Sequence, residues 1–134
     1  MIYIDTGAFI ARHVVRDHHH ESAVGCWKEL EQTGTRCFTS NFVLDEAFTL
    51  LARRTTYAFA ADRARHILAS SVLTILRPGA EQDGRAVELF EKYADQAVSF
   101  TDCISFVLMT EAKLKRAFTF DRHFQSAGFT LWPG

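Results

Sequence analysis

Short apolar runs alternate along the chain with longer segments whose apolar residues recur at helical spacing. The spacing is clearest over 41–54, where Leu44, Ala47 and Leu51 fall on one face of a helix. Strands and helices alternating in this way predict βα units around a parallel sheet, which is an α/β fold. The predicted strands are 2–4, 36–39, 72–76, 117–120 and 129–132, and the predicted helices are 22–32, 41–54, 57–69, 81–93 and 101–113.

No segment of the chain has the composition of a linker between domains. Its 134 residues include only two prolines and seven glycines, and no internal repeat is present. Hydrophobic residues make up 48% of the chain and include twelve phenylalanines, so a large core can form and a disordered chain is excluded. We therefore predict that residues 1–134 form a single domain.

The charge balance and the cysteines narrow the class of protein further. Fifteen Lys and Arg residues against sixteen Asp and Glu give a net charge of −1, so nucleic-acid binding would need a local basic patch. The three cysteines fit neither a disulfide framework nor a Cys-x-x-Cys metal site, and we expect them to be reduced. Without a charged leader or an apolar run near the ~20 residues of a membrane span, a cytoplasmic protein with no membrane association is expected.

Acidic residues stand where predicted strands or loops give way to helices. Asp5 follows the first strand, Asp121 follows the fourth, and Asp102 lies at the start of a helix. Because the carboxyl ends of parallel strands meet at one edge of a sheet, these three carboxylates are expected to converge in one crevice. Each could instead serve its own helix, Asp5 and Asp121 as N-caps and Asp102 in a capping box with Ser99.

The predicted helix 41–54 offers two neighbouring acids as a fourth carboxylate. Asp45 has Asn41 and Thr49 at helical spacing and so lies on a polar stripe. Glu46 has Phe42 and Leu50 at the same spacing, so its carboxylate emerges beside apolar surface, which is costly unless a positive charge meets it. Glu46 is therefore the acid that we expect to face the crevice.

Four carboxylates packed together repel one another unless a cation lies among them. Oxygen ligands select Mg²⁺ or Mn²⁺ over zinc, which prefers nitrogen and sulfur. Such an ion suits phosphodiester hydrolysis, because it activates water and neutralises charge on the phosphoryl group. A P-loop enzyme is excluded because its glycine-rich motif is absent, and a phosphatase with an Asp nucleophile would need a second Asp where Gly7 stands.

Four short motifs carry these acids along the chain. They are Met-Ile-Tyr-Ile-Asp5-Thr6, Ser40-Asn-Phe-Val-Leu-Asp-Glu46, Ser99-Phe-Thr-Asp102 and Thr119-Phe-Asp121-Arg-His-Phe. In this order and spacing they resemble the PIN-domain ribonucleases, and among these the VapC-like toxins, over essentially the whole chain. The resemblance implies a three-layer, Rossmann-like α/β/α PIN domain with five parallel strands, and an endoribonuclease that uses Mg²⁺ or Mn²⁺.

By position, the resemblance also implies roles for individual residues and for partners. Thr6 and Thr119 match hydroxyl residues that support the site, whereas Gly7 stands where the family often has a small hydroxyl residue. An RNA substrate, a cognate antitoxin and a homodimer are implied as well. Two other functions stay open: an RNA-processing PIN nuclease that is not a toxin, and a non-catalytic module that binds RNA or protein. The implied catalytic and metal-binding acids are Asp5, Glu46, Asp102 and Asp121.

Basic, histidine and aromatic residues outside these motifs have their own interpretations. Arg12 and Arg53, a few helical turns from the acids, are the candidate contacts to an RNA backbone. The consecutive histidines 18–20 cannot all face one ion from a helix and are expected to be a solvated helix start. His123, two residues after Asp121, either contacts a substrate phosphate or is a surface residue, and the surface position is the expectation. Trp27, with the aromatics that follow position 55, forms either a groove for an antitoxin helix or ordinary core.

Overall fold

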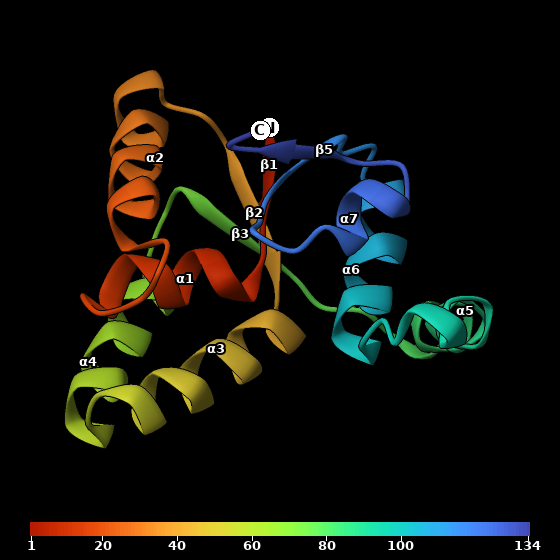
Figure 1. The fold of residues 1–134 in the computed structure, drawn as a ribbon, viewed down its shortest axis with the longest axis horizontal. Helices are drawn as coiled ribbons and strands as arrows, with labels where there is room; N and C mark the ends of the chain where they lie inside the picture. The colour runs from red at the N-terminus through yellow and green to blue at the C-terminus, as the bar shows by residue number, and fades with distance from the viewer.

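A five-stranded parallel sheet forms the middle layer of the molecule, which a computed structural model describes over residues 1–134 (Figure 1). Each strand pairs in parallel with its neighbour, so the predicted α/β fold with five parallel strands is confirmed. In order across the sheet, the strands are β3 (Leu73–Leu76), β2 (Cys37–Ser40), β1 (Ile2–Ile4), β4 (Arg116–Phe118) and β5 (Thr130–Trp132).

The central strand β1 explains why the chain begins with an uninterrupted apolar run. Ile2, Tyr3 and Ile4 are all fully buried, because β2 and β4 flank the strand and helices cover both faces of the sheet. From β1 the chain builds outward to β2 and β3, and later returns to the other side of β1 to form β4 and β5. The strand order therefore reverses between β1 and β4, where open α/β sheets bind their ligands.

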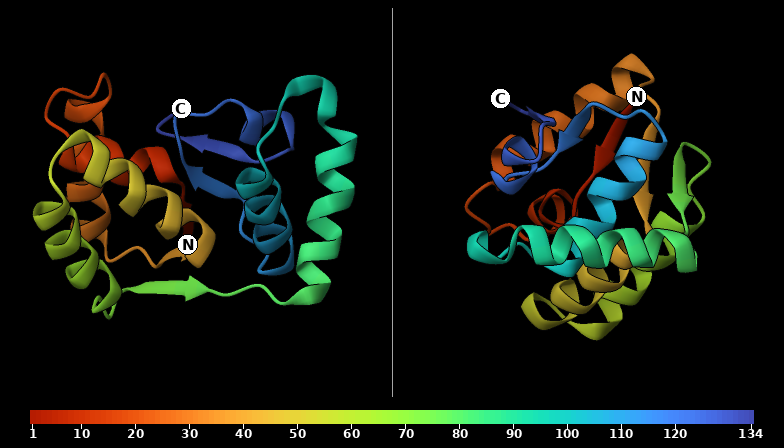
Figure 2. Two further views of the ribbon diagram at one scale, coloured as in Figure 1. Left: turned by 90° about the horizontal axis from the view of Figure 1, so that it is seen from below. Right: turned by 90° about the vertical axis from the view of Figure 1, so that its right-hand side faces the viewer.

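Two groups of helices cover the sheet from opposite sides, which completes the three layers (Figures 1 and 2). One group packs α1 against α2 and α3, and α3 against α4; the other packs α5 against α6. None of these helices has the length and apolar character needed to cross a membrane. The helices are α1 (Thr6–His13), α2 (His20–Thr33), α3 (Asn41–Arg54), α4 (Tyr57–Leu68), α5 (Ala80–Lys92), α6 (Phe100–Glu111) and α7 (His123–Ser126), with a 3₁₀ turn at Ala94–Gln96.

Helices α1 and α7 follow Asp5 and Asp121, where N-caps were considered, but the apolar pattern predicted no helix range for either. Helix α1 is only eight residues long, contains Gly7, and has no side-chain capping bond from Asp5, so its local propensity is poor. Its consecutive residues Ala8, Phe9 and Ile10 are all buried, and the helix packs against both α2 and α3. Tertiary packing therefore stabilises a helix that would not form in isolation.

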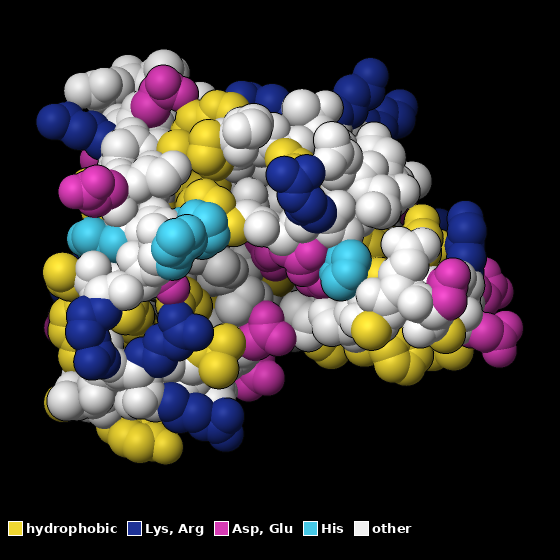
Figure 3. Space-filling model, in the orientation of Figure 1, with side chains coloured by type: hydrophobic (Ala, Val, Ile, Leu, Met, Phe, Trp, Pro, Cys, Tyr) yellow, Lys and Arg dark blue, Asp and Glu magenta, His cyan; other side chains and the backbone are white.

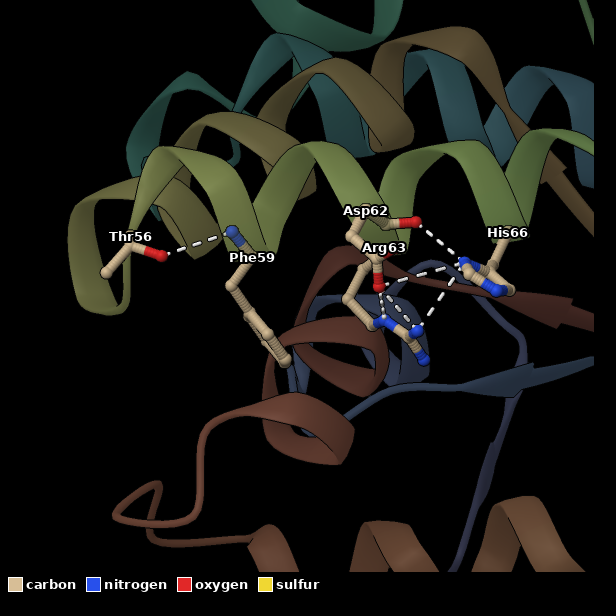
Figure 4. Close-up of polar contacts among 5 residues, drawn as sticks. All are labelled: Thr56, Phe59, Asp62, Arg63 and His66. Carbon is tan, nitrogen blue, oxygen red and sulfur yellow. Dashed lines mark hydrogen bonds and ion pairs between the residues drawn. The ribbon is translucent and has the colours of Figure 1, made fainter.

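Helix α4 begins with a local capping bond and carries a polar network on its exposed side (Figure 4). The backbone N–H of Phe59 donates to Thr56 Oγ1 at 3.1 Å, which satisfies one free N–H group of the first turn. Further along, the Arg63 guanidinium donates to Asp62 Oδ2 at 2.7 Å, and His66 Nδ1 lies 2.8 Å from the carbonyl oxygen of Asp62. These contacts are solvent-exposed, so they contribute little to stability.

Candidate active site

A crevice of about 420 Å³ opens at the carboxyl ends of β1 and β4. The structure brings all four predicted acids into its lining, although 116 positions separate Asp5 from Asp121. Figure 3 shows acidic side chains in the central hollow of the molecule, with a histidine side chain beside them. Ten residues line the crevice: Asp5, Thr6, Gly7, Glu46, Ala97, Ser99, Asp102, Phe120, Asp121 and His123.

Asp5 lies at the floor of the crevice and is 5% exposed. The hydroxyl of Thr119 donates to Asp5 Oδ2 at 2.7 Å, and the same hydroxyl accepts from the backbone N–H of Asp121 at 3.0 Å. Thr119 thereby links the ends of β1 and β4 and orients two of the acids. Since Asp5 makes no side-chain capping bond to α1, the N-cap interpretation does not account for its position.

Asp102 and Asp121 belong to local turns as well as to the crevice. The Ser99 hydroxyl accepts from the backbone N–H of Asp102 at 3.1 Å, so half of the expected capping box is present and the Asp102 carboxylate is left for the crevice. Asp121 Oδ1 accepts from the backbone N–H of His123 at 2.8 Å, which fixes the turn into α7. Both carboxylates therefore occupy positions that the backbone holds in place.

The fourth acid comes from α3, where the two candidates face different surroundings. Glu46 is half-buried and lines the crevice, whereas its neighbour Asp45 is exposed. Ser40 begins the helix by accepting from the backbone N–H of Val43 at 3.1 Å, which sets the rotation of the helix relative to the end of β2. The structure therefore places Glu46, the acid that the helical spacing favoured, in the crevice lining.

Burial and crowding change the acidity of the two deepest carboxyls. Burial raises the pKa of Asp5 to about 6, an effect that the Thr119 hydrogen bond opposes and that the charges of Asp121 and Glu46 reinforce. Burial also raises the pKa of Asp102 to about 9, with the Asp5 and Asp121 carboxylates adding to the effect. The raised pKa values of Asp5 and Asp102 show that no positive charge in the crevice compensates their ionised carboxylates.

We expect the chelator-treated protein to lose stability as the pH rises. A raised carboxyl pKa in the folded state contributes stability that is complete below the unfolded value of about 4 and is lost through the folded value. The loss should therefore run to about pH 6 for Asp5 and extend toward pH 9 for Asp102. Denaturant unfolding at about pH 5 and about pH 8 measures it. Asp102→Asn should shrink the difference, and a wild type that is equally stable at both pH values would contradict the crowding.

The crevice has the chemistry of a site for a hard divalent cation. Its carboxylates are acceptors only when ionised, and the buried hydroxyl oxygen of Thr6 has no hydrogen-bond partner. Oxygen donors of this kind suit Mg²⁺ or Mn²⁺. The residues present therefore fit a divalent metal, and a bound ion would remove the repulsion that raises the two pKa values.

Two histidines lie elsewhere than expected: His123 lines the crevice, and His19 packs against the lining residue Phe120. His123 was expected on the surface, but it lines the crevice and its Nδ1 atom is buried. His19, immediately before α2, stacks on Phe120 with ring centroids 4.1 Å apart and ring planes at 2°. The spacing of His123 two residues after Asp121 was the available signal. Nothing local could place His19, because its partner is 101 positions away.

The candidate RNA contacts Arg12 and Arg53 take different positions. Arg12 does not reach the crevice: it pairs with Glu31 at 3.1 Å, stacks over Trp27 at 4.6 Å and lines a separate cavity. The expectation for Arg12 rested on helical distance alone and is not supported, because α1 directs this side chain toward α2. Arg53 is exposed in the last turn of α3, and Figure 3 shows Lys and Arg side chains gathered over that helix, beside the hollow.

Trp27 lies in the core, which decides between its two interpretations. It is 8% exposed, and its indole N–H donates to the carbonyl oxygen of Ala8 at 3.0 Å. Its ring packs on Phe9 and Phe118. The core interpretation therefore holds for Trp27, whereas Tyr57 at the start of α4 is 78% exposed.

Comparison with known proteins gives consistent matches over nearly the whole chain. A family model described as PIN domain matches residues 2–130. The 23S rRNA-specific endonuclease VapC20 of Mycobacterium tuberculosis is 33% identical over 129 residues, covering 96% of this chain and 95% of that protein. A VapC ribonuclease of Archaeoglobus fulgidus is 34% identical over 115 residues, covering 84% of this chain and 72% of that protein. The crystal structure of M. tuberculosis VapC20, described as a sarcin-ricin loop cleaving toxin, superimposes with a TM-score of 0.86 at 31% identity and covers 97% of both chains.

Proposed function

The chain belongs to the PIN-domain family and is a VapC-like ribonuclease within it, and from this premise we propose that its acidic crevice hydrolyses RNA with Mg²⁺ or Mn²⁺. The observation that supports the site most strongly is the convergence of four carboxylates from four separate segments of the chain. Two of them have pKa values raised by burial and by one another. The proposed metal-binding and catalytic acids are Asp5, Glu46, Asp102 and Asp121.

Several residues in and around the crevice have an assigned part in the proposed reaction. A bound divalent ion supplies the activation of water and the neutralisation of phosphoryl charge. The Thr119 hydroxyl binds Oδ2 of Asp5, which leaves Oδ1 without this hydrogen bond. The Ser99 hydroxyl caps the start of α6 through the backbone N–H of Asp102, which leaves the Asp102 carboxylate available to the crevice. We assign Glu46 the role of general base, which accepts the proton of the attacking water. Glu46 lines the crevice from α3, whereas the other three acids come from other segments of the chain.

The substrate and partners follow from the relatives that the chain resembles. Two relatives are named as an rRNA-specific endonuclease and a ribonuclease, and the solved VapC20 structure is described as a toxin, so we propose an RNA substrate and toxin activity for this chain. A cognate antitoxin is proposed from the resemblance to the VapC-like toxins. Because the VapC20 relative is 23S rRNA-specific, ribosomal RNA is the first substrate to test. We further propose that residues 1–134 act as one PIN domain, that the protein is a homodimer, and that it works in the cytoplasm, where ribosomal RNA resides.

Cleavage assays with and without a chelator test the proposed function. Purified protein should cut single-stranded and ribosomal RNA in Mg²⁺ or Mn²⁺, and EDTA should abolish the cleavage. Water attack on phosphorus leaves a 5′-phosphate and a 3′-hydroxyl, which ligation-based mapping of the ends detects. A 2′,3′-cyclic phosphate would mean that the RNA's own 2′-hydroxyl attacks. Cleavage that continues in EDTA would contradict the metal dependence and give the acids another role.

A further inference from the structure

His123 stands beside two of the crevice acids with its Nδ1 atom turned toward them. Nδ1 lies 3.2 Å from Asp121 Oδ1 and 3.8 Å from Asp102 Oδ2. The atom is buried, and its contact with Asp121 lacks the geometry of a hydrogen bond, so it has no hydrogen-bond partner. At these distances a protonated ring forms ion pairs with both carboxylates, whereas a neutral ring with its proton on Nε2 presents a lone pair to the same crevice.

The backbone holds the ring in this position. The N–H of His123 donates to Asp121 Oδ1 at 2.8 Å, and His123 then begins the short helix α7. Behind it, Phe124 is fully buried in the core and anchors the helix. The ring of His123 is therefore directed at the crevice by the same turn that positions the Asp121 carboxylate.

The three groups are close enough together for small side-chain movements to bring them around one ion. One ligand atom from each of Asp102, Asp121 and His123 can be chosen so that all three lie within 4.8 Å of one another. Adjacent ligands of an octahedral ion with bonds near 2.1 Å are about 3 Å apart, and opposite ligands are about 4 Å apart. A neutral imidazole with its proton on Nε2 offers a lone pair at Nδ1, and that lone pair is what a metal would bind.

We propose that His123 Nδ1 binds the divalent cation together with the Asp102 and Asp121 carboxylates, so that the site contains one nitrogen ligand. This inference rests on the proposed metal-dependent function and specifies which ion it prefers. Imidazole suits transition-metal ions, whereas Mg²⁺ strongly favours oxygen and keeps its water ligands. The site is therefore adapted to Mn²⁺ over Mg²⁺, and His123 is the residue that sets the preference.

Pulsed electron paramagnetic resonance on the Mn²⁺-loaded protein reads the ligand directly. Wild type should show modulation from a directly bound imidazole nitrogen, and labelling the protein with ¹⁵N-histidine should replace the ¹⁴N signal by that of ¹⁵N. His123→Asn, which puts an amide group near the place of Nδ1, should lose the imidazole signal. Its Mn²⁺ affinity should fall by about tenfold or more. Its Mg²⁺ affinity, measured by competition, should change by less than about threefold.

The matched control is His66→Asn on helix α4. Its ring is exposed and contacts Asp62 outside the crevice, so this variant should keep both the imidazole signal and the Mn²⁺ affinity (Figure 4). Bound Mn²⁺ without a histidine signal in wild type, or a signal that survives in His123→Asn, would overturn the assignment while leaving a carboxylate metal site. The labelled wild type gives this answer even if the variant fails to fold. If wild type binds no Mn²⁺ at all, the proposed metal-dependent function fails with it.

Discussion

Glu46→Gln is expected to lower the kcat for RNA cleavage by about 100-fold or more, while the protein stays folded. The substitution keeps the shape of the side chain but removes the negative charge and the ability to accept a proton from water. Glu46 is half-buried in the crevice wall, and α3 supplies no other acid to the crevice. Single-turnover cleavage of a labelled RNA at saturating enzyme measures the chemical step separately from RNA binding.

Asp45→Asn is the matched control, because it makes the same chemical change one position earlier in α3. Asp45 is exposed and outside the crevice lining, so the rate should stay within about twofold of wild type. Equal losses in the two folded variants would show that the rotation of α3 assigned here is wrong. Unchanged cleavage in Glu46→Gln would instead limit the catalytic acids to Asp5, Asp102 and Asp121.

Asp5→Asn is expected to stabilise the protein without a divalent ion and to make it less stable than wild type when the ion is added. In EDTA near pH 8 the variant should be more stable than wild type by about 1–3 kcal/mol, because it removes a buried charge whose ionisation the fold opposes. The amide oxygen can still accept from the Thr119 hydroxyl, so that hydrogen bond is kept. In Mn²⁺ the order should invert, because only wild type gains fully from an ion that binds the folded state.

Thermal melting of both proteins in EDTA and in Mn²⁺ gives the four temperatures that this comparison needs. A ligand at 100 times its dissociation constant stabilises a folded protein by about 2.7 kcal/mol, which is readily detected as a rise in Tm. The opposite result has a clear meaning. If Asp5→Asn melts well below wild type in EDTA and neither protein responds to Mn²⁺, Asp5 is a structural residue at the start of α1 rather than a metal ligand.

Periodicity in the chain was sufficient to predict much of the fold and part of the crevice. The five strands and the five longer helices appear at the expected places, and α3 runs from Asn41 to Arg54 as predicted. Local spacing also distinguished Glu46 from Asp45, because a helix turns by a fixed angle per residue and the two acids must face different surroundings. These features depend on residues close together in the sequence, so they can be predicted without the folded structure.

Contacts between distant segments fix the features that local spacing could not predict. Helix α1 forms because α2 and α3 bury its apolar residues, although its own sequence is a poor helix former. Arg12 is held by Glu31 and Trp27 instead of reaching the crevice, and His123 turns inward beside Asp102, 21 positions earlier in the chain. The fold class and the acidic character of the site could be predicted from the chain, because the alternation of strands and helices and the positions of the acids after them are local features. The direction of each remaining side chain was decided by packing, since the same local pattern is compatible with a surface residue and with a ligand.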